Sequence, residues 1–264
     1  MFGATLNHEA RVYVSQQELS GIQSATLSSA NGVAIGNLVG LESGVSYLDG
    51  PFQGQFSLNR LMVYDDPIWD YTGTNPASGS IHHGDIKYGF EGAYLSSYTI
   101  NAAVGSLPKV NASFDVYGLI SSGISACGDV AHPIIDIPTQ GSISINCDHI
   151  STNRVIGFDY SATIKRNPIY VFGASNLAAA NDVDTIYPIQ YNAQIQIEID
   201  DAEISGSQAL PILNLDTATL TIKGRNGNLL GTYDIPNATL VGESISATSN
   251  GVMVMNLNYK GHGV

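Results

Sequence analysis

The stretch Ile189-Gln190-Tyr191-Asn192-Ala193-Gln194-Ile195-Gln196-Ile197-Glu198-Ile199-Asp200 alternates apolar and polar side chains without a break. A period of two places successive side chains on opposite faces of a β-sheet. One face of this stretch is apolar, and the other is mostly uncharged and polar. Antiparallel strands that rest one face on a core have this composition. The stretch therefore predicts a half-buried antiparallel strand.

The same alternation recurs along the chain, and turn residues separate the alternating stretches. Asn226-Gly227 and Asn250-Gly251 each lie between two apolar-rich stretches, as expected of tight hairpin turns that need positive φ. The helix signals are short, at residues 176–180 and 207–213. We predict a mostly-β fold of two tandem antiparallel β-sandwich or barrel domains, each with at most one short helix. The other alternating stretches are residues 52–59, 111–116, 158–165, 217–223 and 255–260.

Blocks of the first half of the chain recur in order in the second half. The spacing between matched blocks is close to half the chain length, which argues against chance matches between alternating strands. We predict a duplication, with β-domains at residues 1–130 and 131–264 and a connection around residues 123–148. A shift of 137 positions matches residues 24–27 (SATL) with 161–164 (SATI), and a slightly larger shift matches 93–95 (AYL) with 238–240 (ATL).

Each half also contains a long stretch without clear periodicity. These stretches run from Gly36 to Gly50 and from Gly173 to Tyr187. Loops of this length in compact domains are usually functional or bind something.

The charge balance is acidic and sparse. The chain has 10 Lys and Arg against 23 Asp and Glu, a net charge of −13, and only 12% charged residues. No Lys or Arg cluster is present. Because binding to phosphates depends on clustered cations, the sequence disfavours nucleic-acid binding. A surface so poor in charge is typical of one that copies of the same chain cover.

Hydropathy, the first residues and the cysteines indicate the cellular compartment. No window has the roughly 18 consecutive apolar residues of a membrane-spanning helix, and residues 1–9 lack the pattern of a secretion signal. We expect no membrane segment and no export. Cys127 and Cys147 are too few for a disulfide framework. Two free thiols is the favoured interpretation, and pairing across a mid-chain hairpin stays open.

Motifs that carry chemistry are absent from the sequence. No nucleophile elbow, phosphate loop or dinucleotide fingerprint occurs. The adjacent His82 and His83 fit an exposed polar loop better than a metal site. Asp65, Asp66 and Asp70 flank Trp69, and a loop with a packing anchor explains them better than a paired-carboxylate glycosidase does. We expect no enzyme activity and no cofactor or metal.

Three stretches resemble the tail tube proteins of long-tailed bacteriophages. They are residues 94–114 (YLSSYTINAAVGSLPKVNASF), 19–25 (LSGIQSA) and 50–58 (GPFQGQFSL). The resemblance implies a β-sandwich or barrel with a flanking helix that assembles into stacked rings around a channel. A duplicated chain resembles members in which three subunits form a pseudo-sixfold ring. It also implies a virion tail location, assembly in the host cytoplasm, and contacts with other tail proteins.

The resemblance also gives roles to particular residues. Asp115, Glu198 and Asp200 lie on the polar side of expected strands and are candidates for the channel wall. An acidic wall would repel phosphates, so DNA would pass without specific binding. The two long loops are candidates for contacts between stacked rings, and the residues singled out there are Gly36, Leu41, Tyr47, Gly173, Asp182 and Asp184.

Two other functions stay open. A tandem β-sandwich binding module, such as a distal tail, decoration or carbohydrate-recognition protein, would need an exposed aromatic patch. Trp69 and Tyr71 are the candidates to seed it. A hydrolase with carboxylates at Asp65, Asp66 and Asp70 is the weakest alternative.

Overall fold

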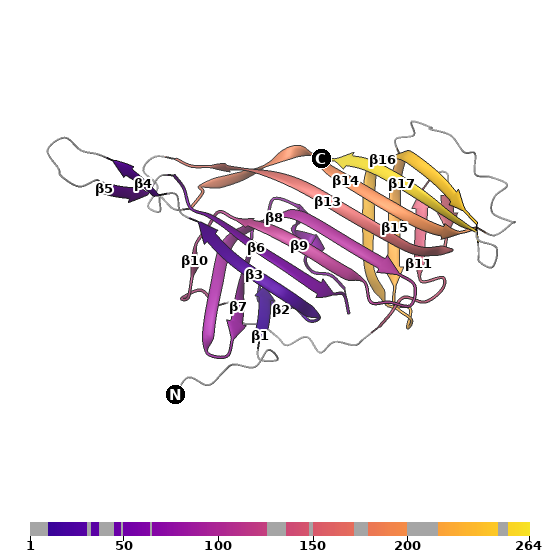
Figure 1. Cartoon of the computed structure of the whole chain (residues 1–264), viewed down its shortest axis with the longest axis horizontal. Helices are drawn as coiled ribbons and strands as arrows, with labels where there is room; N and C mark the ends of the chain where they lie inside the picture. Colours follow the sequence, from indigo (N-terminus) through magenta and orange to yellow (C-terminus); the bar gives the residue numbers. More distant parts are fainter. Residues whose placement is uncertain are drawn as a thin grey trace.

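The computed structural model describes residues 10–30, 33–36, 45–48, 50–63, 65–125, 136–147, 150–171, 179–199, 216–247 and 253–264, and these are nearly all β-strand (Figure 1). Every strand pair in these ranges is antiparallel. Their one helix is a short 3-10 turn, Trp69–Thr72. The mostly-β prediction is confirmed. The helix expected at 207–213 lies outside the described residues, as does most of 176–180.

Among the described residues, the first half has ten strands, and its long strand β8 has different partners along its length. β8 pairs with β9 through its second part, and with β7 and β10 through its first part. The order of pairing is β3-β6-β9-β8-β7-β1-β2. The strands are β1 (Ala10–Val14), β2 (Gln17–Glu18), β3 (Ile22–Ala30), β4 (Val33–Gly36), β5 (Val45–Leu48), β6 (Gln53–Leu61), β7 (Ala77–His83), β8 (Ile86–Ala103), β9 (Lys109–Val116) and β10 (Ile120–Ser121).

The second half pairs its strands in the order β13-β14-β17-β16-β15-β11-β12, with β16 in the position of β8. β16 likewise pairs with β15 through its first part and with β17 through its second. The strands are β11 (Ile143–Cys147), β12 (Ile150–Thr152), β13 (Val155–Ile169), β14 (Asp182–Glu198), β15 (Asp216–Lys223), β16 (Leu229–Ser246) and β17 (Val254–Gly263). β11 lies inside the stretch expected to be only a connection.

Irregularities recur at the same places in the two orders of pairing. Gln23 is the extra residue of a bulge where β3 meets β6, and Ile156 is the extra residue where β13 meets β14. Ser96 bulges from β8 against β9, and Val241 bulges from β16 against β17. Bulges fix the register of a sheet, because a slip of one residue would turn every side chain to the other face.

The two halves share one sheet and one core. β8 pairs with β13 over Ser97 to Ala103, so a main sheet runs β3-β6-β9-β8-β13-β14-β17-β16 (Figure 1). The inner side chains of both halves form a single apolar cluster that includes Phe56, Phe114 and Ile195. Burial of each large apolar side chain contributes roughly 1.5–3 kcal/mol, which explains why the alternating stretches become these strands.

Several local expectations differ from the structure. Gly36 ends β4, and β4 pairs with β5, so part of the first long loop is a hairpin. β14 begins at Asp182, inside the second expected loop. His82 is buried on β7, where its Nε2 lies 2.8 Å from Ser80 Oγ, rather than in an exposed loop. Alternation was hidden there because small and polar residues, among them Gly79, Ser80 and His82, are buried on both faces of β7.

Candidate assembly interface

Two edges of the main sheet have no partner strand among the described residues. β3 pairs only with β6, and residues 239–246 of β16 pair only with β17. In the middle of the same sheet, the corresponding strands β13 and β8 pair with each other. Free edges present unpaired N–H and C=O groups that can template pairing with another strand. The main sheet is therefore open at both ends, and its middle shows one way in which such ends can join.

The apolar side chains at these free edges are exposed, whereas their counterparts at the internal seam are buried. Ile100 of β8 faces Tyr160 of β13 at the seam, and each is 1% exposed. Ile245 holds the position of Ile100 in β16 and is 57% exposed. Leu27 holds the position of Tyr160 in β3 and is only partly buried. A partner strand at each edge would cover these two side chains.

Beneath the internal seam, the halves meet in an aromatic cluster. The ring of Trp69 lies 4.9 Å from Tyr98 and 5.4 Å from both Tyr160 and Tyr233, measured between centroids. Trp69 and Tyr98 belong to the first half and the other two to the second. Tilted aromatic pairs contribute roughly 0.5–1.5 kcal/mol each beyond their buried area. The loop after β6 therefore fastens the two halves together.

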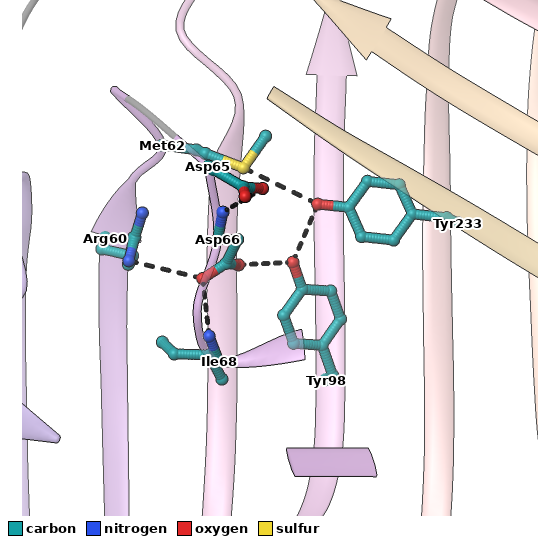
Figure 2. A network of polar contacts seen from close by, with 7 residues as sticks. All are labelled: Arg60, Met62, Asp65, Asp66, Ile68, Tyr98 and Tyr233. Atoms are coloured by element: carbon teal, nitrogen blue, oxygen red, sulfur yellow. Dashed lines mark hydrogen bonds and ion pairs between the residues drawn. The ribbon is translucent and has the colours of Figure 1, made fainter. Parts of the chain in front are cut away.

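A buried polar network completes this seam (Figure 2). Asp66 forms an ion pair with Arg60 at 3.3 Å and accepts a hydrogen bond from the Tyr98 hydroxyl at 2.6 Å. The hydroxyls of Tyr98 and Tyr233 lie 3.0 Å apart. Burial, with the nearby Asp66 charge, raises the pKa of both tyrosines. The network thus keeps two neutral hydroxyls and one ion pair inside the core.

Arg166 fastens the seam at its other end. Its guanidinium donates to the backbone carbonyl of Leu95 at 3.1 Å and to that of Gly73 at 2.8 Å, and it also bonds the Thr185 hydroxyl. It also lies 5.7 Å from the ring centre of Tyr94. Leu95 precedes the bulge in β8, so Arg166 connects the second half to that irregular point of the first.

The face of the main sheet that points away from the apolar core is polar and contains a depression. A depression of about 650 Å³ lies over the central strands. Its polar side chains are mostly uncharged, with one carboxylate, Asp159, and one amine, Lys260. They come from strands β8, β9, β13, β14 and β17, and they are Thr99, Asn101, Asn111, Asp159, Ser161, Asn192, Gln194, Asn258 and Lys260.

Side chains on this polar face bond one another across strands. Asn59 donates to Asn111 at 2.7 Å, and Asn111 donates to Thr99 at 3.4 Å. Asn101 donates to the Asp159 carboxylate across the seam between the halves. Such cross-strand pairs stabilise a sheet by roughly 0.2–1 kcal/mol each. They also fix the orientation of the polar groups that the hollow presents.

Two of the three channel-wall candidates lie on this face. Asp115 is on β9, half-buried, and burial raises the pKa of its carboxyl. Glu198 ends β14, where its side chain is half-buried and its backbone N–H donates to the carbonyl of Arg154. Asp200 lies outside the described residues. The face is largely neutral, not strongly acidic as the net charge had indicated.

Four of the six ring-stacking candidates lie in β4, β5 and β14. Gly36 ends β4 and Tyr47 belongs to β5, while Leu41 and Gly173 lie outside the described residues. Asp182 and Asp184 are exposed at the start of β14. In Figure 1, the β4–β5 hairpin lies at the far left and the joined ends of β13 and β14 extend toward the same side. The β13–β14 end also exposes Ile169, Tyr170, Val171, Ile186 and Tyr187.

The aromatic and acidic residues of the loop at 65–71 have structural contacts. Trp69 packs in the seam cluster, and Tyr71 packs against the core with its ring 6.4 Å from Phe114. Asp66 is in the buried ion pair, and Asp70 is exposed. The two rings therefore do not form the exposed platform that a carbohydrate-binding patch requires.

Metal-ligating groups, membrane-spanning helices and thiols are the other features to consider in the described part of the chain. No group of three or more metal-ligating side chains occurs there, and no helix in those ranges has the length and apolarity needed to cross a membrane. Cys147 is a free thiol whose sulfur lies 3.8 Å from the Tyr259 hydroxyl. Cys127 lies outside the described residues.

No protein-family model matches the sequence, and none of the curated proteins matches it.

Sequence reasoning missed the residues that fasten the seam and those that its free edges expose. Arg60 and Arg166 stand at core positions of alternating strands, where a charged residue is a signal of a buried partner. Ile245 belongs to a block that matched residues 100–102 in the repeat. That match relates Ile245 to Ile100, but it does not say which of the two strands has a partner.

Proposed function

We propose that this chain is a structural subunit that joins copies of itself head to tail through β3 and β16, and that it forms the tail tube of a long-tailed bacteriophage. The observation that carries the proposal is the internal seam between β8 and β13. The two halves pair their strands in the same order with bulges at the same places, which supports a duplication. If the halves are equivalent, the free edge of β16 in one copy corresponds to the β8 edge of the internal seam. The free edge of β3 in another copy corresponds to the β13 edge.

The internal seam also sets the register of the proposed contact. Ile100 pairs with Tyr160 and Thr99 with Ser161 inside the chain. Counting from the shared bulges, the same register pairs Ile245 of one copy with Leu27 of the next. It likewise pairs Ser244 with Ser28 and Ser246 with Thr26. The apolar pair then faces the core, and the hydroxyl pairs face the polar side, as in the rest of the sheet.

Head-to-tail contacts of this kind are heterologous, and a ring is their finite form. A ring leaves no free edge in the main sheet, which removes the aggregation hazard that open edges carry. With two equivalent halves in each chain, three chains give a ring with pseudo-sixfold symmetry, as the resemblance to tail tube proteins implies. The polar, hollowed face would line the channel of that ring.

A channel wall of this composition suits DNA passage. Amide and hydroxyl side chains dominate the polar face, and the few amines on it do not cluster. Nucleic-acid affinity comes mainly from clustered cations that release counterions. A neutral to weakly acidic wall therefore gives DNA no site at which to stick.

The proposal extends to stacking and location. The β4–β5 hairpin and the β13–β14 end would contact the next ring, with Asp182 and Asp184 among the contacts. The protein would belong to the virion tail, assemble in the host cytoplasm, and contact other tail proteins at the tube ends. This role needs no cofactor and no catalysis.

The test combines light scattering with negative-stain electron microscopy of the purified chain. We expect rings or tubes with an open channel. Ile245→Lys should leave a folded monomer, because it places an ammonium in the apolar side of the contact. Leu229→Lys is the matched control, since Leu229 is an exposed apolar residue on the same strand away from the free edge. Rings that persist unchanged with Ile245→Lys would overturn the edge contact.

Cysteine cross-linking counts the copies. Leu27→Cys and Ile245→Cys are combined in a Cys127→Ser, Cys147→Ser background, since directly opposed strand residues approach disulfide distance. Oxidation should give covalent dimers and trimers and then stop, because a three-membered ring has no further free edge. A ladder ending at six chains would overturn the threefold ring.

One observation favours the alternative of a binding module. The hollow over the polar face offers amides, hydroxyls and the Asp159 carboxylate at fixed positions, which are the groups that bind sugar hydroxyls. A chain that stays monomeric at every concentration, and that binds a glycan through this hollow, would support this alternative over the tube.

A further inference from the structure

The internal seam includes a hydroxyl contact whose counterpart between copies has different chemistry. Inside the chain, Tyr233 of the second half meets Tyr98 of the first, with their hydroxyls 3.0 Å apart and Tyr98 donating to Asp66. Tyr233 is 0% exposed. The residues that hold these two positions in the proposed contact between copies are Tyr88 and Glu243.

Tyr88 holds in the first half the position that Tyr233 holds in the second. Tyr88 pairs with Ile81 across β7 and β8, two residues before Phe90. Tyr233 pairs with Leu220 across β15 and β16, two residues before Ile235. Phe90 and Ile235 each lie next to the same shift of register in their strand pairs, on its N-terminal side along β8 and β16. Tyr88 therefore points to the core side of its sheet, yet it is 52% exposed.

The difference in exposure has a visible cause. In the second half, Met62 and Trp69 of the first half cover Tyr233: the Tyr233 hydroxyl lies 3.6 Å from the Met62 sulfur, and its ring lies 5.4 Å from Trp69. Among the described residues, nothing covers Tyr88 in this way, since its side chain is 52% exposed. Exposed Ile86 and partly buried Ile81 lie beside it. The second half of another copy is the occupant that the internal seam predicts for this face.

Glu243 holds in β16 the position that Tyr98 holds in β8. Tyr98 is the second residue after the bulge at Ser96 and pairs with Ala112. Glu243 is the second residue after the bulge at Val241 and pairs with Leu257. Both therefore lie on the apolar side of the main sheet. Glu243 is half-buried there, two residues along the strand from the exposed Ile245.

We infer that, in the assembled ring, the Tyr88 hydroxyl of one copy donates a hydrogen bond to the Glu243 carboxylate of its neighbour. This inference rests on the proposed function, and it assigns the polar contact that fixes the subunit seam. A hydrogen bond to an ionised acceptor is about twice as strong as a neutral one. Once the ring closes, the same contact gives the carboxylate a donor in place of the water it loses.

The contact also distinguishes the two kinds of seam. Inside the chain, a tyrosine meets a tyrosine supported by Asp66, and between copies a tyrosine meets a carboxylate. The pairing of Leu27 with Ile245 buries apolar surface in the contact. The hydrogen bond adds a requirement on geometry, because it forms in only one register of the two strands. Tyr88 and Glu243 are therefore specificity-determining residues of the subunit contact.

The test is a double-mutant cycle on ring dissociation, measured by light scattering against dilution. We expect Tyr88→Phe to weaken association roughly tenfold per contact, and Glu243→Gln to weaken it less because an amide still accepts a hydrogen bond. The two effects should be coupled, with the double variant close to Tyr88→Phe alone. Glu91→Gln is the matched control, an exposed carboxylate on the opposite face of β8 from Tyr88, and should leave ring dissociation unchanged.

The outcomes separate this inference from the proposed function. Rings that form, and cross-link through the Leu27 and Ile245 cysteines, while the cycle shows additive or absent effects, would overturn the hydrogen bond alone. A chain that never assembles would overturn both. Each variant should unfold at the wild-type urea midpoint as a monomer, because both side chains are at least partly in water there, and this excludes a folding defect as the cause.

Discussion

The guanidinium of Arg166, on β13, donates to the backbone carbonyl of Leu95, on β8, and so joins the two halves of the chain at a bulge. The same side chain reaches the carbonyl of Gly73 and the hydroxyl of Thr185. One buried cation thereby satisfies acceptors from a loop and two strands. Regular sheet pairing could not satisfy the acceptors at an irregular point of this kind.

Arg166→Met should destabilise the chain by about 2–4 kcal/mol, because it removes several buried hydrogen bonds and leaves their acceptors without a donor. The free energy of unfolding in urea measures the effect. Lys165→Met is the matched control, since Lys165 is the exposed neighbour on the same strand, and it should change stability by less than about 0.5 kcal/mol. Equal effects of the two variants would show that Arg166 does not fasten the seam.

Asp66→Asn should destabilise the chain by about 3–5 kcal/mol. The change leaves the buried Arg60 without its anionic partner, and breaking one side of a buried ion pair is strongly destabilising. Urea unfolding again measures it. Asp70→Asn, in the same loop but exposed, is the control and should be nearly neutral. Replacing Arg60 and Asp66 together with Met and Leu should restore much of the loss, since no unpaired charge then remains.

Alkaline pH should unfold the chain through its buried tyrosines. Burial raises the pKa of Tyr117 to about 12, and it raises those of Tyr98, Tyr160, Tyr233 and Tyr259 as well. A raised pKa in the folded state means that stability is fully present below the unfolded value near 10 and is lost as pH rises above it. Stability should therefore be flat through neutral pH and fall from about pH 10 upward.

Ultraviolet absorbance of the phenolate checks this expectation. The buried tyrosines should ionise together with the loss of the strand signal in circular dichroism. A titration in which all tyrosines ionise near pH 10 while the strand signal persists would contradict the burial of the seam cluster.

The fold class was predictable from the sequence because alternation and turn chemistry act locally. Residues 189–198 of the alternating stretch lie in β14, and the Asn226-Gly227 turn joins β15 to β16, with Gly227 at a φ of 82°. The match of residues 93–95 with 238–240 also agrees with the pairing, because Leu95 and Leu240 both precede a bulge. These features need no knowledge of distant contacts.

Alternation cannot fix register, however, so the sequence match and the bulges align the two halves differently. The shift of 137 positions set Ser24 against Ser161, but Ser24 and Gly157 are the residues that follow the bulges in β3 and β13. A slip by an even number of residues keeps every side chain on its own face, so the pattern is blind to it. The pairing of β8 with β13 could not be predicted either, because alternation does not say which strands lie side by side.

The polar face offers a test of the channel itself. Asn192→Lys and Gln194→Glu lie two residues apart on β14, both exposed and both lining the hollow. Asn192→Lys repeats its charge in every chain of a ring and should give assembled rings a salt-dependent affinity for double-stranded DNA, because clustered cations release counterions. Gln194→Glu should give none. Fluorescence anisotropy with a short duplex at two salt concentrations measures both, and stability should be unchanged in each case. Affinity gained equally by rings and by the Ile245→Lys monomer would show that the face binds as a patch and not as a channel wall.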